Sequence, residues 1–184
     1  KALNATIHPM VSFFLNLDKE RIIKRYCHLH PMVNREKLVE ILNYQCKYFV
    51  WSGADLINST SAGGKRQMVV IENNSSPSGQ KSMPLLDDNK EDGSYRLLVE
   101  RTFKPMLKSR AVKAISGKLA VLYDKNHMEV SGYASTIADL TKEDVYLIPH
   151  FDEEDQCISF KDGVMILTLN SGEDVPIRAA FRYV

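Results

Sequence analysis

The chain has 184 residues, and its 24 basic side chains nearly balance its 23 acidic ones, leaving a formal net charge of +1. This balance excludes the overall positive field that draws proteins to nucleic acids or anionic membranes, and we expect neither partner. Hydrophobic residues make up 44% of the chain and charged residues 26%, as in ordinary folded domains. The length favours a fragment or a small domain pair over a multi-lobed enzyme.

The three cysteines, Cys27, Cys46 and Cys157, lie far apart and form no CxxC pair. This usage predicts reduced thiols and a cytoplasmic location. No apolar run approaches the roughly 20 residues that cross a bilayer, and the first residues do not resemble a signal peptide. The start at Lys1 rather than methionine indicates a trimmed start or a missing leader.

Two short helices are predicted in the first quarter of the chain. Between residues 18 and 30, apolar residues at helical spacing follow Asp18, which can cap the helix, and precede Pro31. A second helix is predicted from Asn34 to near Gly53, because apolar residues recur every three or four positions. The pair predicts a helical hairpin.

A turn, a strand and a charged insertion are predicted next. Gly63-Gly64-Lys65-Arg66 is similar to a phosphate loop but lacks the Walker spacing and the following helix, so residues 59–66 predict a hairpin turn. Met68–Ile71 is a β-rich apolar run that predicts a buried strand. Residues 87–93 are charged and predict a solvated insertion.

The second half predicts a small α/β unit. Helical spacing from Tyr95 to Leu107 contains Pro105, which should kink or divide the helix. Strand 118–123, helix 131–140 and strand 145–148 then have the spacing of a β-α-β unit with parallel strands and a right-handed crossover.

Further strands are predicted at the end of the chain, at 157–160, 164–169, 175–181 and, separately, 182–184. Lys161-Asp162-Gly163 predicts a tight hairpin turn between the first two. The predicted fold class is therefore α/β (α+β): a helical segment and a motif-bearing strand, followed by a small βαβ unit with a β-hairpin.

Residues 71–80 are the best candidate for a metal- and phosphate-binding loop. Glu72 and Asn74 are two residues apart on the predicted strand, so both side chains point to one face and can reach one Mg²⁺ ion. Pro77 and Gly79 permit a tight loop whose N–H groups approach an anion, and polar side chains add donors at Ser75, Ser76, Ser78, Gln80 and Lys81. From composition alone, a solvated surface turn is the alternative.

The segment Val70-Ile71-Glu72-Asn73-Asn74-Ser75-Ser76-Pro77-Ser78-Gly79 resembles the Glu-x-Asn-x-x-Pro-Gly segment of the ATP-grasp fold. Its Pro-Ser-Gly form is similar to that of circularly permuted ATP-grasp proteins of the glutathionylspermidine-synthase-like type. The order of elements also resembles that family, with a pre-ATP-grasp-like unit after the loop. One departure is that Asp124-Lys125-Asn126 and Gly132–Ser135 replace the family's small-residue turn and Glu-His pair.

The resemblance implies part of an ATP- and Mg²⁺-dependent carboxylate–amine ligase, with an acid and an amine as substrates and an acyl phosphate as intermediate. It implies metal ligation by Glu72 and Asn74, nucleotide contacts from the loop, and anion binding by Arg182. It divides the chain into residues 1–110, with the helices, strand and loop, and residues 111–184, the pre-ATP-grasp-like unit. The adenine pocket is expected beyond Val184, so this portion can be inactive alone; a non-enzymatic α/β ligand-binding or interaction domain is the alternative.

Other residues carry weaker signals. His28 and His30 point in different directions on a helix and predict a surface pair rather than a metal site. His127 and His150 flank the β-α-β unit, where loops after strands bind ligands. Cys157 predicts a strand core residue rather than a nucleophile.

Overall fold

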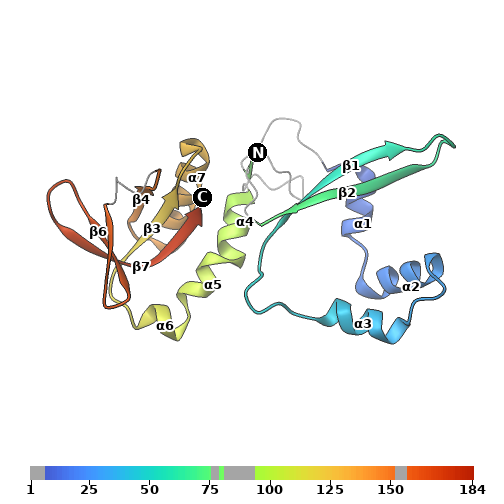
Figure 1. The fold of residues 1–184 in the computed structure, drawn as a ribbon, viewed down its shortest axis with the longest axis horizontal. Coiled ribbons are helices and arrows are strands. Elements are labelled where there is room, and N and C mark those ends of the chain that lie inside the picture. The colour runs from blue at the N-terminus through green and yellow to red at the C-terminus, as the bar shows by residue number, and fades with distance from the viewer. Residues whose placement is uncertain (1–6, 76–78, 81–93, 152–156) are drawn as a thin grey trace.

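The computed structural model describes residues 7–75, 79–80, 94–151 and 157–184 (Figure 1). Within these residues the chain combines helices with a two-stranded antiparallel sheet and a five-stranded mixed sheet, which confirms the predicted α/β class. The two-stranded sheet lies with the first three helices, and the five-stranded sheet forms the other end of the molecule (Figure 1).

The first three helices are α1 (Pro9–Leu15), α2 (Lys19–Leu29) and α3 (Arg35–Asn43). The predicted cap of α2 is confirmed, because the Asp18 carboxylate accepts the N–H of Arg21 at 2.8 Å. The predicted hairpin of α2 and α3 is joined by an ion pair of 2.9 Å between Arg35 and Glu20. Helix α1 was not predicted.

The prediction that the second helix continues to near Gly53 is wrong, because α3 ends at Asn43. Beyond it the chain is not helical, and Tyr44, Tyr48 and Phe49 are exposed. Trp51 instead packs against the core of the second half of the chain. That contact requires the chain to leave the helix and cross to the other end of the molecule.

Strands β1 (Gly53–Thr60) and β2 (Arg66–Asn74) form an antiparallel ribbon. The predicted hairpin turn is confirmed: Ser61 donates its N–H to the carbonyl of Lys65 at 2.9 Å, and Gly64 has a φ of +77° that favours glycine. The expected burial of the apolar run is wrong, since Val69, Val70 and Ile71 are exposed. A two-stranded ribbon without a covering layer cannot bury both of its faces.

Three helices follow: α4 (Ser94–Arg101), α5 (Phe103–Leu107) and α6 (Arg110–Lys113). The predicted division of a longer helix falls at Thr102, and Pro105 lies in the first turn of α5, where its missing N–H breaks no helical bond. Leu98, Val99 and Phe103 join the core of the second half. In the structure α4 and α5 therefore belong with the five-stranded sheet, whereas the sequence placed residues up to 110 with the first unit.

The five-stranded sheet has the order β4-β3-β7-β6-β5. Its parallel unit is β3 (Lys118–Tyr123), α7 (His127–Thr141) and β4 (Val145–Pro149), which confirms the predicted β-α-β unit. Strands β5 (Ile158–Lys161) and β6 (Val164–Thr168) form the predicted hairpin. Strand β7 (Asp174–Tyr183) is parallel to β3 and antiparallel to β6. It is one continuous strand, so the separate strand predicted at 182–184 is wrong.

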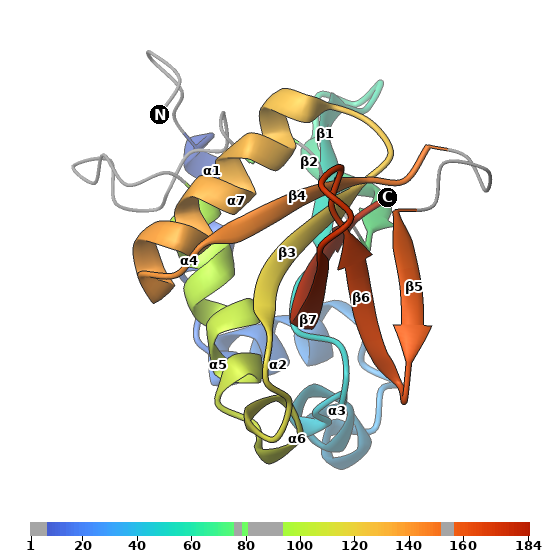
Figure 2. The same ribbon diagram turned by 90° about the vertical axis from the view of Figure 1, so that its left-hand side faces the viewer.

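Helix α7 begins four residues before its predicted start. Asn126, with a φ of 52°, turns the chain and its side-chain oxygen accepts the N–H of Glu129 at 3.4 Å. Helices α4, α5 and α7 gather along one side of the sheet (Figure 2). A Cβ on Gly132 would lie 2.7 Å from the ring of Tyr95, so glycine permits this close packing of α4 on α7.

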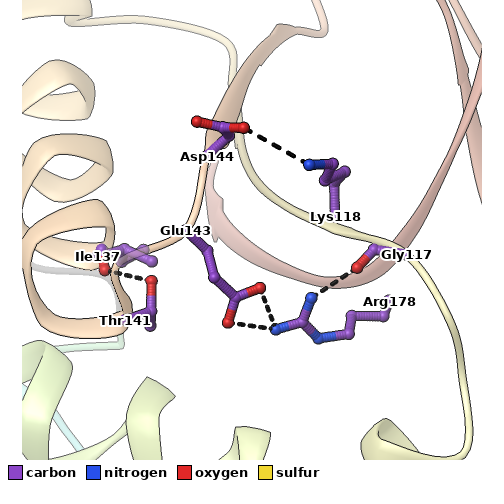
Figure 3. Close-up of polar contacts among 7 residues, drawn as sticks. All are labelled: Gly117, Lys118, Ile137, Thr141, Glu143, Asp144 and Arg178. Atoms are coloured by element: carbon purple, nitrogen blue, oxygen red, sulfur yellow. Dashed lines mark hydrogen bonds and ion pairs between the residues drawn. The ribbon is translucent and has the colours of Figure 1, made fainter.

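Polar contacts join the starts of β3 and β4 to β7 (Figure 3). The guanidinium of Arg178 donates to the carbonyl of Gly117 at 2.6 Å and to the carboxylate of Glu143 at 2.6 and 2.8 Å. Lys118 and Asp144 form a longer, exposed pair at 3.5 Å. This end of the sheet is opposite to the carboxyl ends of the parallel strands, where the candidate site residues of β7 lie.

Candidate functional site

Glu72 and Asn74 lie near the end of β2, just before the candidate loop. Their side chains share one face of the ribbon because side chains alternate along a strand. Glu72 is exposed and Asn74 is half-buried. Both oxygen-bearing groups are therefore accessible from the same side.

Asp55 on β1 is paired directly with Glu72. Cross-strand partners point to the same face, so two carboxylates and the Asn74 amide gather on one surface. Gly53, the partner of Asn74, adds no side chain there. Carboxylate and amide oxygens suit a hard cation such as Mg²⁺, so this donor set fits a magnesium ion.

The contribution of Asp55 was missed by sequence reasoning. The pairing depends on a register shift between Asp55 and Leu56, where β2 has one extra residue. A bulge of this kind exchanges the faces on which the side chains beyond it lie. No residue pattern in the two strands predicts the bulge.

The described part of the candidate loop packs against helix α7. Gly79 has a φ of +75°, as expected for a tight turn at a glycine. Gln80 is only 1% exposed, and its N–H donates to the buried carboxylate of Glu129 at 2.9 Å. Its carbonyl accepts the hydroxyl of Ser94 at 2.9 Å. The backbone of Gln80 is thus engaged by protein groups, while Ser76, Ser78 and Lys81 lie outside the described residues.

The loop and strand β7 border one cavity of about 340 Å³, which we call the loop cavity. Its lining includes Ser75, next to Asn74, and Phe181, Arg182 and Tyr183 of β7. Tyr48, Phe49 and Trp51 add aromatic walls. The structure therefore brings Ser75, at the start of the candidate loop, and Arg182, more than 100 positions later in the sequence, to one cavity.

The floor of the loop cavity includes Tyr133 of α7. Burial raises the pKa of its phenol well above the ordinary value, and the Glu129 carboxylate, by its charge and a hydrogen bond, raises it further. Tyr133 therefore stays protonated and acts as a hydrogen-bond donor rather than a base.

Arg182 also borders a second cavity, of about 610 Å³, on the opposite face of the sheet. His150, the residue after β4, lies in the same cavity. We call it the sheet-face cavity. The sequence placed Arg182 and His150 separately near strand ends, and the structure brings them together.

Among the described residues, the other candidates that the sequence offered do not come together to form a site. His28 and His30 are exposed, and His30 stacks on Tyr26 with ring centroids 4.5 Å apart. Cys157 packs against a core cluster, as predicted. In the described part of the chain, no three or more His, Cys, Asp or Glu side chains group closely enough to hold a metal, and no helix is long and apolar enough to cross a membrane.

Comparisons with known proteins give no relative for this chain: no family model, no curated protein and no solved structure matches it.

Proposed function

We propose that the chain forms part of an ATP- and Mg²⁺-dependent carboxylate–amine ligase that proceeds through an acyl phosphate. The observation that carries the proposal is the meeting, at one cavity, of the loop that follows Glu72 and Asn74 with the strand that carries Arg182. The resemblance of residues 70–79 to the ATP-grasp loop gives the same assignment.

The oxygen donors of Asp55, Glu72 and Asn74 would hold the metal. Two carboxylates directly opposite each other in a ribbon repel, and a cation between them relieves that repulsion. When bound, Mg²⁺ would neutralise and orient the phosphate oxygens of the nucleotide.

The other residues position groups around this centre. Ser75, and in the resemblance Ser76, Ser78 and Lys81, would donate to phosphate oxygens. The end of β7 that carries Arg182 borders both cavities, and its side chain, on the face of the sheet-face cavity, would bind an anionic group of the acid substrate. The buried and half-buried aromatic residues of the loop cavity, Trp51, Tyr133 and Phe181, would exclude water from the acyl phosphate, which water otherwise hydrolyses. The three free cysteines fit a cytoplasmic enzyme.

A calorimetric titration of ATP with and without Mg²⁺ tests this assignment. We expect Mg²⁺-dependent binding by the parent chain and its loss in Glu72→Ala, because the variant lacks a ligand of the metal. Glu40→Ala is the matched control, since Glu40 is an exposed carboxylate on α3 and should bind as the parent does. Binding that is independent of Mg²⁺, or equal in the Glu72 variant, would contradict the metal assignment.

A non-enzymatic interaction domain is the second candidate. It is favoured by large apolar side chains left exposed in the first half of the chain, among them Met32 at 97% and Tyr48 at 84%. If the folded parent chain binds neither Mg²⁺ alone nor ATP with Mg²⁺, the metal assignment fails and this second function becomes the better explanation.

A further inference from the structure

The sheet-face cavity lies at the carboxyl ends of β3, β4 and β7, on the side away from α7. In α/β sheets this edge is where ligands bind. Its volume of about 610 Å³ is within the range of small-molecule sites. Its walls are mainly apolar and include Leu122, Ile158, Phe160 and Met165.

A bulge in β7 directs Arg182 into this cavity. The β3–β7 register shifts between Lys118 and Leu119, where β7 has Arg178 as an extra residue. After the shift, Ala179 and Tyr183 face the core on the α7 side, and Ala180 packs against the opposite core. Because side chains alternate along a strand, Arg182 lies on the same face of β7 as Ala180. Leu122, the residue of β3 that pairs with Arg182, also packs on that face.

His150 is held at the cavity by its backbone. Its N–H donates to the carbonyl of Tyr123 at 2.8 Å, which continues the ladder of β3 and β4 by one residue. Within the described residues, neither the Arg182 guanidinium nor the His150 imidazole makes an ion pair or hydrogen bond. An arginine and a histidine thus border an apolar cavity, and neither side chain is paired with another of the described residues.

The hairpin of β5 and β6 forms the opposite wall. Pairing of β6 with β7 ends at Met165 and Ile177, so the tip of the hairpin leaves the later part of β7 unpaired on that edge. Phe160 near the tip is 75% exposed. The cavity therefore opens between the hairpin tip and Arg182, and its lining combines the nitrogen donors of Arg182 and His150 with apolar side chains.

We infer that the sheet-face cavity binds a carboxylate that bears an apolar group, with the carboxylate between Arg182 and His150 and the apolar group against Ile158, Phe160 and Met165. A guanidinium pairs with a planar carboxylate through two parallel hydrogen bonds, which gives the orientation. The identification of this ligand as the acid substrate rests on the proposed function, whereas the binding itself does not.

Nuclear magnetic resonance titration of the whole chain with hexanoate tests the inference, without nucleotide or metal. We expect saturable shifts of the methyl signals of Leu122, Ile158 and Met165. Hexanamide keeps the alkyl group of hexanoate but lacks its charge, and acetate keeps the charge but lacks most of the alkyl group. Each should bind at least about tenfold more weakly than hexanoate.

Variants identify the side chains that bind the carboxylate. Arg182→Ala and His150→Ala should each weaken hexanoate binding, by about tenfold for Arg182, and Arg182→Lys should retain part of it. Arg110→Ala is the matched control, because this exposed arginine of α6 borders neither cavity. The dispersion of the resonance signals checks that each variant is folded. If a variant does not fold, the comparison of hexanoate with hexanamide on the parent chain still tests the inference.

Absence of saturable shifts, equal binding of hexanamide, or unchanged affinity in Arg182→Ala would each overturn the inference. Unchanged affinity in His150→Ala would remove His150 from the site. Glu72→Ala should bind hexanoate as the parent does. Hexanoate binding by a chain that binds neither Mg²⁺ nor ATP would therefore refute the metal assignment on which the ligase rests and leave the carboxylate site standing, and the reverse result would refute only the site.

Discussion

The hydroxyl of Tyr133 lies beside the carboxylate of Glu129 in the packing between α4, α7 and β7. Tyr133 is 1% exposed, and its ring contacts those of Tyr95, Phe181 and Tyr183. Burial, followed by the charge of Glu129, raises the pKa of the phenol above that of an unfolded tyrosine. The neutral phenol is therefore a structural donor that holds the Glu129 carboxylate in place.

This raised pKa makes a prediction for stability at alkaline pH. An unfolded tyrosine ionises near about pH 10, whereas folded Tyr133 does not, so the stabilisation is complete below pH 10 and is lost as the pH rises above it. We expect the free energy of unfolding in urea to fall above about pH 10, and Tyr133→Phe to reduce that slope.

Tyr48→Phe is the matched control, because Tyr48 is 84% exposed and should leave the slope unchanged. Equal slopes in the parent and in Tyr133→Phe would show that the phenol is not protected by the fold.

At the scale of elements, the link between the loop and α7 matters most for the candidate site. It consists of the buried hydrogen bond from the Gln80 N–H to Glu129, with Ser94 of α4 holding the Gln80 carbonyl. Glu129 is placed by the first turn of α7, which Asn126 caps. The loop that follows Asn74 is thus anchored to the helix beside the loop cavity.

Removal of this anchor should be measurable. Glu129→Ala leaves the Gln80 N–H buried without an acceptor, so we expect a loss of about 1 to 3 kcal/mol in the free energy of unfolding and faster hydrogen exchange at Gln80. Glu129→Gln, which keeps an acceptor oxygen, should lose less.

Asp139→Ala on the same helix is the control, since Asp139 is exposed. If Gln80 exchanges at the parental rate in Glu129→Ala, the carboxylate does not anchor the loop.

Across the whole molecule, burial is divided unevenly. In the described residues of the first half, 7–75, Ile23 is the one apolar side chain that is fully buried, whereas two core clusters surround the five-stranded sheet. The ribbon and the first helices therefore gain little hydrophobic stabilisation of their own. Trp51 connects them to the second half by packing against its core.

Hydrogen exchange followed by mass spectrometry should reveal this division. We expect amides of β2 to exchange on the order of 100-fold or more faster than those of β3, because the ribbon can open without unfolding the sheet. Equal protection of both strands would show that the chain unfolds as one cooperative unit.

Local sequence signals predicted the elements that local chemistry decides. The start of α2 follows from the Asp18 cap, the turn of β5 and β6 from Asp162 and Gly163 with positive φ, and the β-α-β unit from its spacing. The continuation of α3 was mispredicted because helical spacing continues beyond Asn43, while the distant contact of Trp51 determines the path of the chain.

Sequence alone determined the residue types of the candidate site: the carboxylate and amide of Glu72 and Asn74, the glycine at position 79, and an arginine near the end of the last strand. Tertiary structure decided which of them meet. The bulge opposite Asp55 pairs it with Glu72, and the bulge at Arg178 turns Arg182 towards His150. A shift of one residue exchanges the two faces of a strand, and only the packing of both strands against their neighbours fixes that choice.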